Sequence, residues 1–160
     1  MSRAFVKETD DDTADALPDR PVSTERNLVT PSGYRQIEER LAYWRAQDMN
    51  APADDLTAKA RIARELRYWT ARWSSAELIE PPAEPEQVVF GTTVTLRHPD
   101  DRMQVISLVG EDESAPEDGR IAWTAPLARA LIGLEEGEVV RFHDEDLEIV
   151  TIEPVAESVG

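Results

Sequence analysis

The first half of the chain contains two stretches in which apolar side chains recur every three or four residues, the period of a helix with one buried face. The recurring positions are Tyr34, Ile37, Leu41 and Trp44 in the first stretch and Ile62, Leu66, Trp69 and Trp73 in the second. Thr30 and Pro31 supply an N-cap and a first-turn proline, and a break follows within residues 48–55. Two such helices with a short connection predict an antiparallel helical hairpin, a coiled coil, over residues 27–80.

A different pattern begins after the prolines of residues 81–87, which we interpret as a stiff linker. Apolar and polar residues now alternate, which is the period of a strand with one buried face. Strands are predicted at residues 88–96, 103–109, 120–123, 138–142 and 147–152, and a short helix at 125–133. The predicted fold class is α+β: the hairpin is followed by a small antiparallel-sheet domain with one short helix over residues 88–155, and then by a tail at 156–160.

The start of the chain has a composition of its own. Residues 1–26 are rich in charge and poor in apolar side chains, so we expect a disordered acidic tail that aids solubility, with a partner-binding arm as the alternative. Residues 1–25 hold three basic and seven acidic groups, residues 26–75 nine and six, and residues 76–160 five and twenty. The net charge of −16 argues against a protein that coats DNA in bulk, because neutralising phosphates needs lysine and arginine.

The composition also removes several kinds of chemistry. The chain has no cysteine, which excludes disulfides, thiolate metal sites and cysteine nucleophiles. Its two histidines, His98 and His143, fall in predicted turns, where we expect solvent exposure and no function. Residues 111–113 lack the spacing of a calcium site and are interpreted as an acidic loop. Without a membrane-length apolar run or a secretory signal, we expect a soluble, cytoplasmic protein.

Three motifs follow the predicted hairpin. They are Phe90-Gly91-x-x-Val94, Val109-Gly110-Glu111-Asp112-Glu113, and Pro126-Leu127-Ala128-Arg129-Ala130-Leu131-Ile132-Gly133. With the hairpin, they make residues 28–152 resemble the GreA/GreB family of bacterial transcription factors. The resemblance implies an FKBP-like second domain that docks at the rim of the secondary channel of RNA polymerase, while the hairpin enters that channel. It places the polymerase-binding residues at Thr124, Ala125, Pro126 and Arg129.

The predicted hairpin tip departs from the family pattern. Cleavage-proficient members carry Gly-Asp-Leu-x-Glu-Asn there, and its two carboxylates help to hold a magnesium ion at the polymerase active site. This chain has Asp54-Asp55-Leu56-Thr57-Ala58-Lys59, with Ala58 at the glutamate position and Lys59 at the asparagine position. Asp54 and Asp55 are therefore weak candidates for metal assistance, and capping of the second helix explains both.

The resemblance also makes each arm about two to three helical turns shorter than in the cleavage factors, a deficit of roughly 15 Å. We therefore expect a short-hairpin, Rnk-like regulator of transcription elongation that does not cleave RNA, is not an enzyme, and has no metal or cofactor of its own. One alternative is a cleavage factor that uses Asp54 and Asp55. The other is an unrelated protein-binding module with an FKBP-like domain.

Basic residues follow the predicted tip. Lys59, Arg61 and Arg64 are candidates for contacts with nascent RNA or the channel wall, and a solvated helix face is the competing interpretation. The expected partner is bacterial RNA polymerase, with nascent RNA as a second candidate partner. We expect no membrane partner. We expect the chain to be a monomer.

Overall fold

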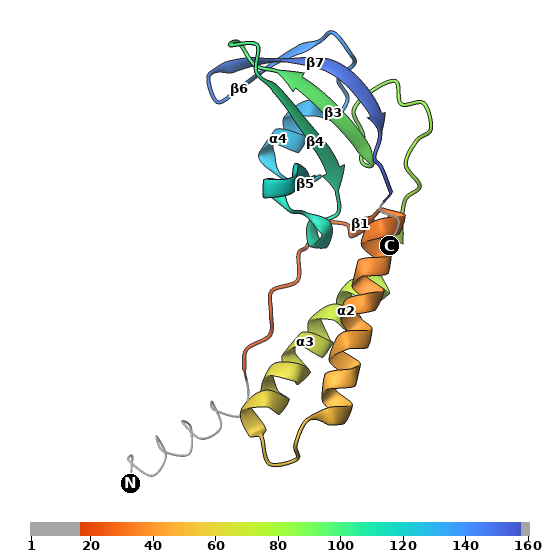
Figure 1. The fold of residues 1–160 in the computed structure, drawn as a ribbon, viewed down its shortest axis with the longest axis vertical. Helices are drawn as coiled ribbons and strands as arrows, with labels where there is room; N and C mark the ends of the chain where they lie inside the picture. The colour runs from red at the N-terminus through yellow and green to blue at the C-terminus, as the bar shows by residue number, and fades with distance from the viewer. Residues whose placement is uncertain (1–16, 158–160) are drawn as a thin grey trace. The chain divides into compact units, whose positions relative to one another are not determined.

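The computed structural model describes residues 17–157. Helix α2 spans Pro31–Asn50 and helix α3 spans Leu56–Ser75, with the turn between them at residues 51–55 (Figure 1). The Thr30 hydroxyl accepts the Gly33 N–H at 3.0 Å, and the Asp55 carboxylate accepts the Ala58 N–H at 3.1 Å. Each helix thus begins at a side-chain cap, as its sequence predicts.

The packed face of the hairpin follows most of the predicted apolar stripe. Ile37 and Leu41 of α2 and Ile62 and Trp69 of α3 are buried. The prediction is wrong at the end of α3, where Trp73 is 41% exposed and Arg72 is only 1% exposed. Arg72 lies on the same side of α3 as Glu65 and Tyr68, which are seven and four residues earlier, and a second segment of the chain contacts that side.

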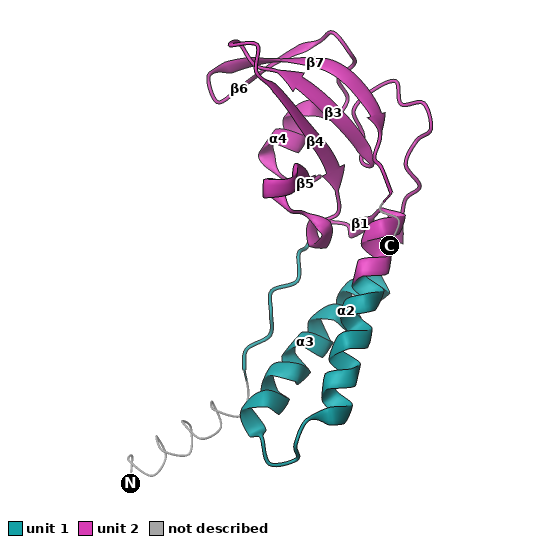
Figure 2. Ribbon diagram, in the orientation of Figure 1, with its two compact units in different colours: residues 1–24, 37–75 teal, residues 25–36, 76–160 magenta. Residues whose placement is uncertain are grey.

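That segment is residues 17–24, which belong to the same compact unit as residues 37–75 of the hairpin (Figure 2). Asp19 pairs with Arg67 at 2.5 Å, and Arg20 pairs with Glu65 at 2.6 Å. The Arg20 guanidinium also lies 3.8 Å from the centre of the Tyr68 ring. The expectation of disorder up to residue 26 is therefore wrong from residue 17 onward. Helix α3 presents side chains of opposite charge to Asp19 and Arg20, and an aromatic ring to Arg20. Residues 1–16 lie outside the described residues.

The second unit, residues 25–36 and 76–157, contains a five-stranded sheet of order β5-β4-β3-β7-β6 (Figure 2). The strands are β3 (Thr92–Arg97), β4 (Met103–Val109), β5 (Arg120–Ala122), β6 (Val139–Phe142) and β7 (Glu145–Pro154). Neighbouring strands are antiparallel, except that β4 and β5 are parallel. Two short 3₁₀ helices, Glu111–Glu113 and Pro116–Asp118, connect β4 to β5.

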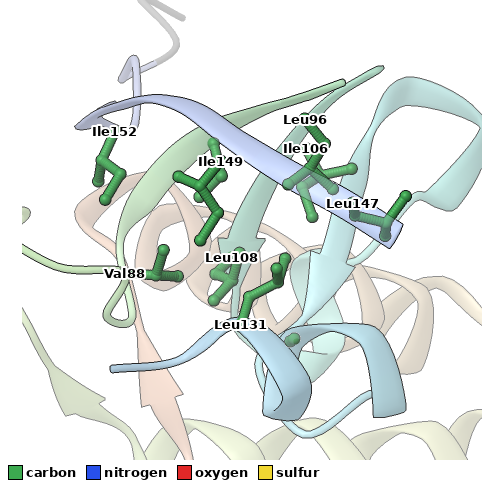
Figure 3. Packing of buried hydrophobic residues seen from close by; sticks show 10 residues of the cluster. Val88, Leu96, Ile106, Leu108, Leu131, Leu147, Ile149 and Ile152 are labelled. Atoms are coloured by element: carbon green, nitrogen blue, oxygen red, sulfur yellow. The ribbon is translucent and has the colours of Figure 1, made fainter. Parts of the chain in front are cut away.

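Helix α4 (Pro126–Leu131) packs on one face of this sheet (Figure 1). Ala128 and Leu131 of α4 share one hydrophobic core with side chains from β3, β4 and β7, among them Leu96, Leu108 and Ile149 (Figure 3). The alternating pattern in the sequence therefore predicted the α+β class, with a hairpin of two helices before a sheet that carries one short helix.

Several predicted element boundaries differ from the structure, and β7, for example, is longer at both ends than the strand predicted at 147–152. Residues 88–90 are not part of the sheet, because the Val88 backbone bonds with Gly133 and Leu134, each at 2.8 Å. Helix α4 ends at Leu131 instead of residue 133, and Gly133 has a positive φ of 94°. Val88 is nevertheless fully buried in the core. The apolar character of this position therefore indicated burial correctly, but it did not indicate pairing within the sheet.

A two-stranded parallel ribbon joins the two ends of the hairpin. Strand β1 (Leu28–Val29) precedes α2, strand β2 (Glu77–Leu78) follows α3, and Leu28 pairs with Glu77. In the segment interpreted as a C-terminal tail, Glu157 accepts the Ser32 N–H at 2.9 Å. None of the helices within residues 17–157 is long and apolar enough to cross a membrane.

Candidate functional site

The loop between β5 and α4, together with the first residue of α4, contains three of the four residues assigned to polymerase binding. Trp123 donates its backbone N–H to Val109, and Ala125 donates to Ala122, both at 2.9 Å. Pro126 opens α4 in the first helical position, where its ring fixes φ, and it is exposed. Backbone bonds on one side and a proline on the other leave this loop little conformational freedom.

Arg129, the fourth residue, lies against the same loop. Its Nε donates to the Thr124 carbonyl at 2.7 Å, and its Nη2 pairs with the Glu25 carboxylate at 3.0 Å. The structure thus brings Thr124 and Arg129 together and adds Glu25. Sequence reasoning missed Glu25, which it placed in a disordered tail, because a contact across 104 positions leaves no local pattern.

The hairpin tip presents two exposed neighbouring aspartates with different surroundings. The Asp55 carboxylate is engaged as the cap of α3, through the Ala58 N–H. Met49 and Leu56 flank the turn and are 85% and 58% exposed. Within residues 17–157 no group of three or more acidic or histidine side chains is arranged to hold a metal ion. The tip on its own therefore offers a cation fewer ligands than a dedicated magnesium or calcium site.

The basic side chains after the tip have separate environments. Lys59 is exposed. The Arg61 guanidinium lies 5.5 Å from the centre of the Trp44 ring, and Arg64 is half-buried, with an Nε that has no partner among the described protein atoms. Arg67 pairs with Asp19. The arginines are thus partly used in packing and pairing, and contact of these residues with RNA or the channel wall stays a prediction.

His98 corrects the expectation of two solvated histidines. It is 7% exposed, its Nε2 bonds with the Gln104 side chain at 2.8 Å, and Arg102 lies 3.1 Å from its Nδ1. Its imidazole joins the two strands of the β3–β4 hairpin. His143 is exposed in the β6–β7 turn with a positive φ of 49°, and its ring lies 4.1 Å from that of Phe142. His98 therefore has a role in the fold.

Glu113 departs from the acidic loop expected at residues 111–113. It is 7% exposed and accepts the Thr30 hydroxyl at 2.7 Å, while the Thr30 oxygen accepts the Gly33 N–H. Burial raises the pKa of the Glu113 carboxyl, an effect that the Thr30 hydrogen bond partly opposes. A Cβ at position 33 would lie 2.7 Å from the Glu113 carboxyl oxygen, so a larger residue there would displace the Glu113 side chain.

Comparison with known proteins identifies the family. A sequence model described as "Transcription elongation factor, GreA/GreB, C-term" matches residues 83–154. The transcription elongation factor GreB of Neisseria meningitidis serogroup B is 32% identical, over 82% of this chain and 97% of its own length. The transcription elongation factor GreA of Pseudomonas aeruginosa is 34% identical, over 78% of this chain and 95% of its own length. The chain belongs to the GreA/GreB family.

Solved structures give a looser match. A GreA/GreB factor from Nitrosomonas europaea has a TM-score of 0.41 and 17% identity, over 81% of this chain and 99% of its own. The GreA factor homolog Gfh1 of Thermus thermophilus has a TM-score of 0.38 and 20% identity, over the same shares of the two chains.

These relatives correct one expectation. The motif at the tip led us to expect that the chain is not an enzyme. Relatives that span most of the chain at 32% and 34% identity are named GreB and GreA, the names that the family resemblance connects with assisted transcript cleavage. A plain exclusion of catalysis is therefore wrong. The Rnk-like subtype stays a prediction.

Proposed function

We propose that this chain is a transcription elongation regulator that binds bacterial RNA polymerase in the cytoplasm, as a monomer, at the rim of the secondary channel. Thr124, Ala125, Pro126 and Arg129 form the docking surface. The observation that supports this most is the bond from the Arg129 Nε to the Thr124 carbonyl, 2.7 Å long, which fixes a guanidinium on the loop beside an exposed proline. A surface that is ordered before binding loses little conformational entropy when a partner docks.

The hairpin is the second part of the proposal. Each helix has 20 residues, which gives it a length of about 30 Å, and the tip would enter the channel. Asp55 is engaged as a helix cap, so Asp54 is the carboxylate with more freedom to approach the polymerase magnesium. One carboxylate stabilises a divalent cation less than two. We therefore expect this factor to assist cleavage more weakly than a factor with longer arms whose tip has an aspartate and a glutamate.

Lys59 is the basic residue best placed for nascent RNA, since it is exposed next to the tip, whereas Arg61 lies over Trp44. Its contact with RNA phosphate would be electrostatic and would weaken with added salt.

Binding is tested with purified core polymerase. Pro126→Asp should reduce affinity at least tenfold, because it removes the rigid start of α4 from the docking surface. Pro99→Asp, at another exposed proline in the β3–β4 turn, is the matched control and should bind like the wild type. Thermal unfolding of both variants must stay close to the wild type. Unchanged binding by a folded Pro126→Asp would place the docking surface elsewhere.

Chemistry is tested on backtracked elongation complexes. Weak stimulation of RNA cleavage is expected from the wild type, and Asp54→Asn should abolish it. Asp55→Asn should retain most of it, since asparagine also caps helices well. Efficient cleavage that needs both aspartates would instead support the alternative cleavage factor with an Asp54–Asp55 pair.

A further inference from the structure

Arg129 is held between a loop carbonyl and a carboxylate. One edge of its guanidinium donates from Nε to the Thr124 carbonyl at 2.7 Å, and a terminal nitrogen lies 3.0 Å from Glu25 Oε1. The first bond removes rotational freedom from the planar group, so the N–H donors of Nη2 have a set direction. A guanidinium oriented in this way is suited to a carboxylate, whose oxygens match the spacing of its N–H donors.

Glu25 is also held in position, although it lies outside the regular elements. The next residue, Arg26, makes two hydrogen bonds to Glu77, at 2.7 and 3.3 Å. Asn27 accepts the Glu77 N–H at 2.8 Å, and the β1–β2 ribbon begins with the pairing of Leu28 and Glu77. Glu25 thus directly precedes an anchored segment, and its carboxylate is presented to Arg129 by the backbone that enters the ribbon.

We propose that Arg129 is a carboxylate-binding residue of the docking surface and that Glu25 occupies it in the free protein. This inference rests on the proposed function. Polymerase would dock by displacing Glu25 and placing an acidic side chain of its own against Arg129. Residues 25–26 then act as a competing strap, and the affinity that is measured equals the intrinsic affinity reduced by the fraction of molecules in which Arg129 is free.

The size of the effect follows from exposure. The side chain of Arg129 is 58% exposed and that of Glu25 is 45% exposed, so water and salt screen their attraction. Exposed pairs of this kind change an equilibrium by a factor of about two to five. The strap therefore tunes binding and does not block it.

The test measures affinity for purified core polymerase. Glu25→Gln keeps the shape of the side chain and removes its charge, so it should tighten binding about two- to fivefold at low salt, with the gain shrinking as salt is added. Glu148→Gln is the matched control, because it breaks an ion pair with Arg97 of similar exposure, 3.2 Å long, on strands β3 and β7. It should leave affinity unchanged.

A second pair of variants shows whether the gain acts through Arg129. Arg129→Ala should weaken binding, and Glu25→Gln should have no further effect in that background. If the wild type binds and Glu25→Gln binds equally well or more weakly, the strap hypothesis is wrong, while the proposed function still holds. Absence of binding by the wild type would overturn the proposed function, and the strap with it. A gain from Glu25→Gln that persists without Arg129 would show that Glu25 acts by general charge, which also overturns the inference.

Discussion

Among single residues, Glu113 has the clearest consequence for stability. Its carboxyl lies in the interior and accepts the Thr30 hydroxyl, whose oxygen in turn caps α2 through Gly33. Because burial raises its pKa above the ordinary value of 4.5, the folded protein holds the Glu113 proton more tightly than the unfolded chain does. Folding is then favoured by the protonated group, and this advantage is lost as the pH rises from about 4.5 through the raised pKa.

Glu113→Gln should remove that pH dependence. Its amide oxygen can still accept the Thr30 hydroxyl, but it has no charge to desolvate. The difference in melting temperature between the variant and the wild type should therefore move in favour of the variant as the pH is raised from 4.5 to 7.5. Charged groups near the site, Arg35, Arg120 and Glu157, remain in both proteins. Glu117→Gln, at an exposed position nearby, should show no such trend, and a pH-independent difference for Glu113→Gln would contradict the prediction.

At the scale of elements, helix α3 is covered on two sides. One side packs on α2 through Ile62 and Trp69, and the other meets residues 17–24 through Glu65 and Tyr68. The side chains of Arg20 and Glu65 are 32% and 20% exposed, so this pair is better shielded than most surface pairs. An arginine that is paired and also lies on an aromatic face should stabilise the unit more than either contact alone.

Arg20→Ala should therefore lower the free energy of unfolding by about 1 kcal/mol, from the lost ion pair and the lost contact with the Tyr68 ring. The measurement is urea unfolding followed by tryptophan fluorescence, which Trp69 reports from the same helix. Arg26→Ala serves as the control, since its partner Glu77 and Arg26 itself are far more exposed. Equal losses from the two variants would mean that residues 17–24 add nothing to the hairpin.

On the scale of the whole molecule, the sequence predicted the features that depend on residues close together along the chain. Helices α2 and α3, their caps and the sheet with its one short helix follow from local periods and turn residues. It did not predict contacts between distant positions, such as Arg20 with Glu65, Leu28 with Glu77, or Glu25 with Arg129. Burial of Glu113 and Arg72 escaped for the same reason, since charge suggests exposure unless the partner is known.

The length of the hairpin gives a prediction at this scale. Ala58→Glu with Lys59→Asn supplies the acidic and amide residues of the cleaving tip, but the helices keep their 20 residues each. If reach limits the chemistry, this double variant should cleave backtracked RNA no better than the wild type. Adding seven residues to each helix lengthens the arms by about 10 Å and should allow the same tip to gain activity. Strong cleavage by the short double variant would show that reach is not limiting.

The parallel ribbon has a consequence for how such proteins can change. Leu28 and Glu77 are paired, so the segment between them, which contains the hairpin, has its two ends held at a fixed spacing. Doubling the length of a closed loop costs only about 0.6 kcal/mol of chain entropy, and added helical turns bring their own packing. Equal insertions or deletions in the two arms would thus leave the clamp and the sheet undisturbed. Because of the ribbon, evolution can lengthen or shorten the two helices of the hairpin without changing the structure of the sheet domain.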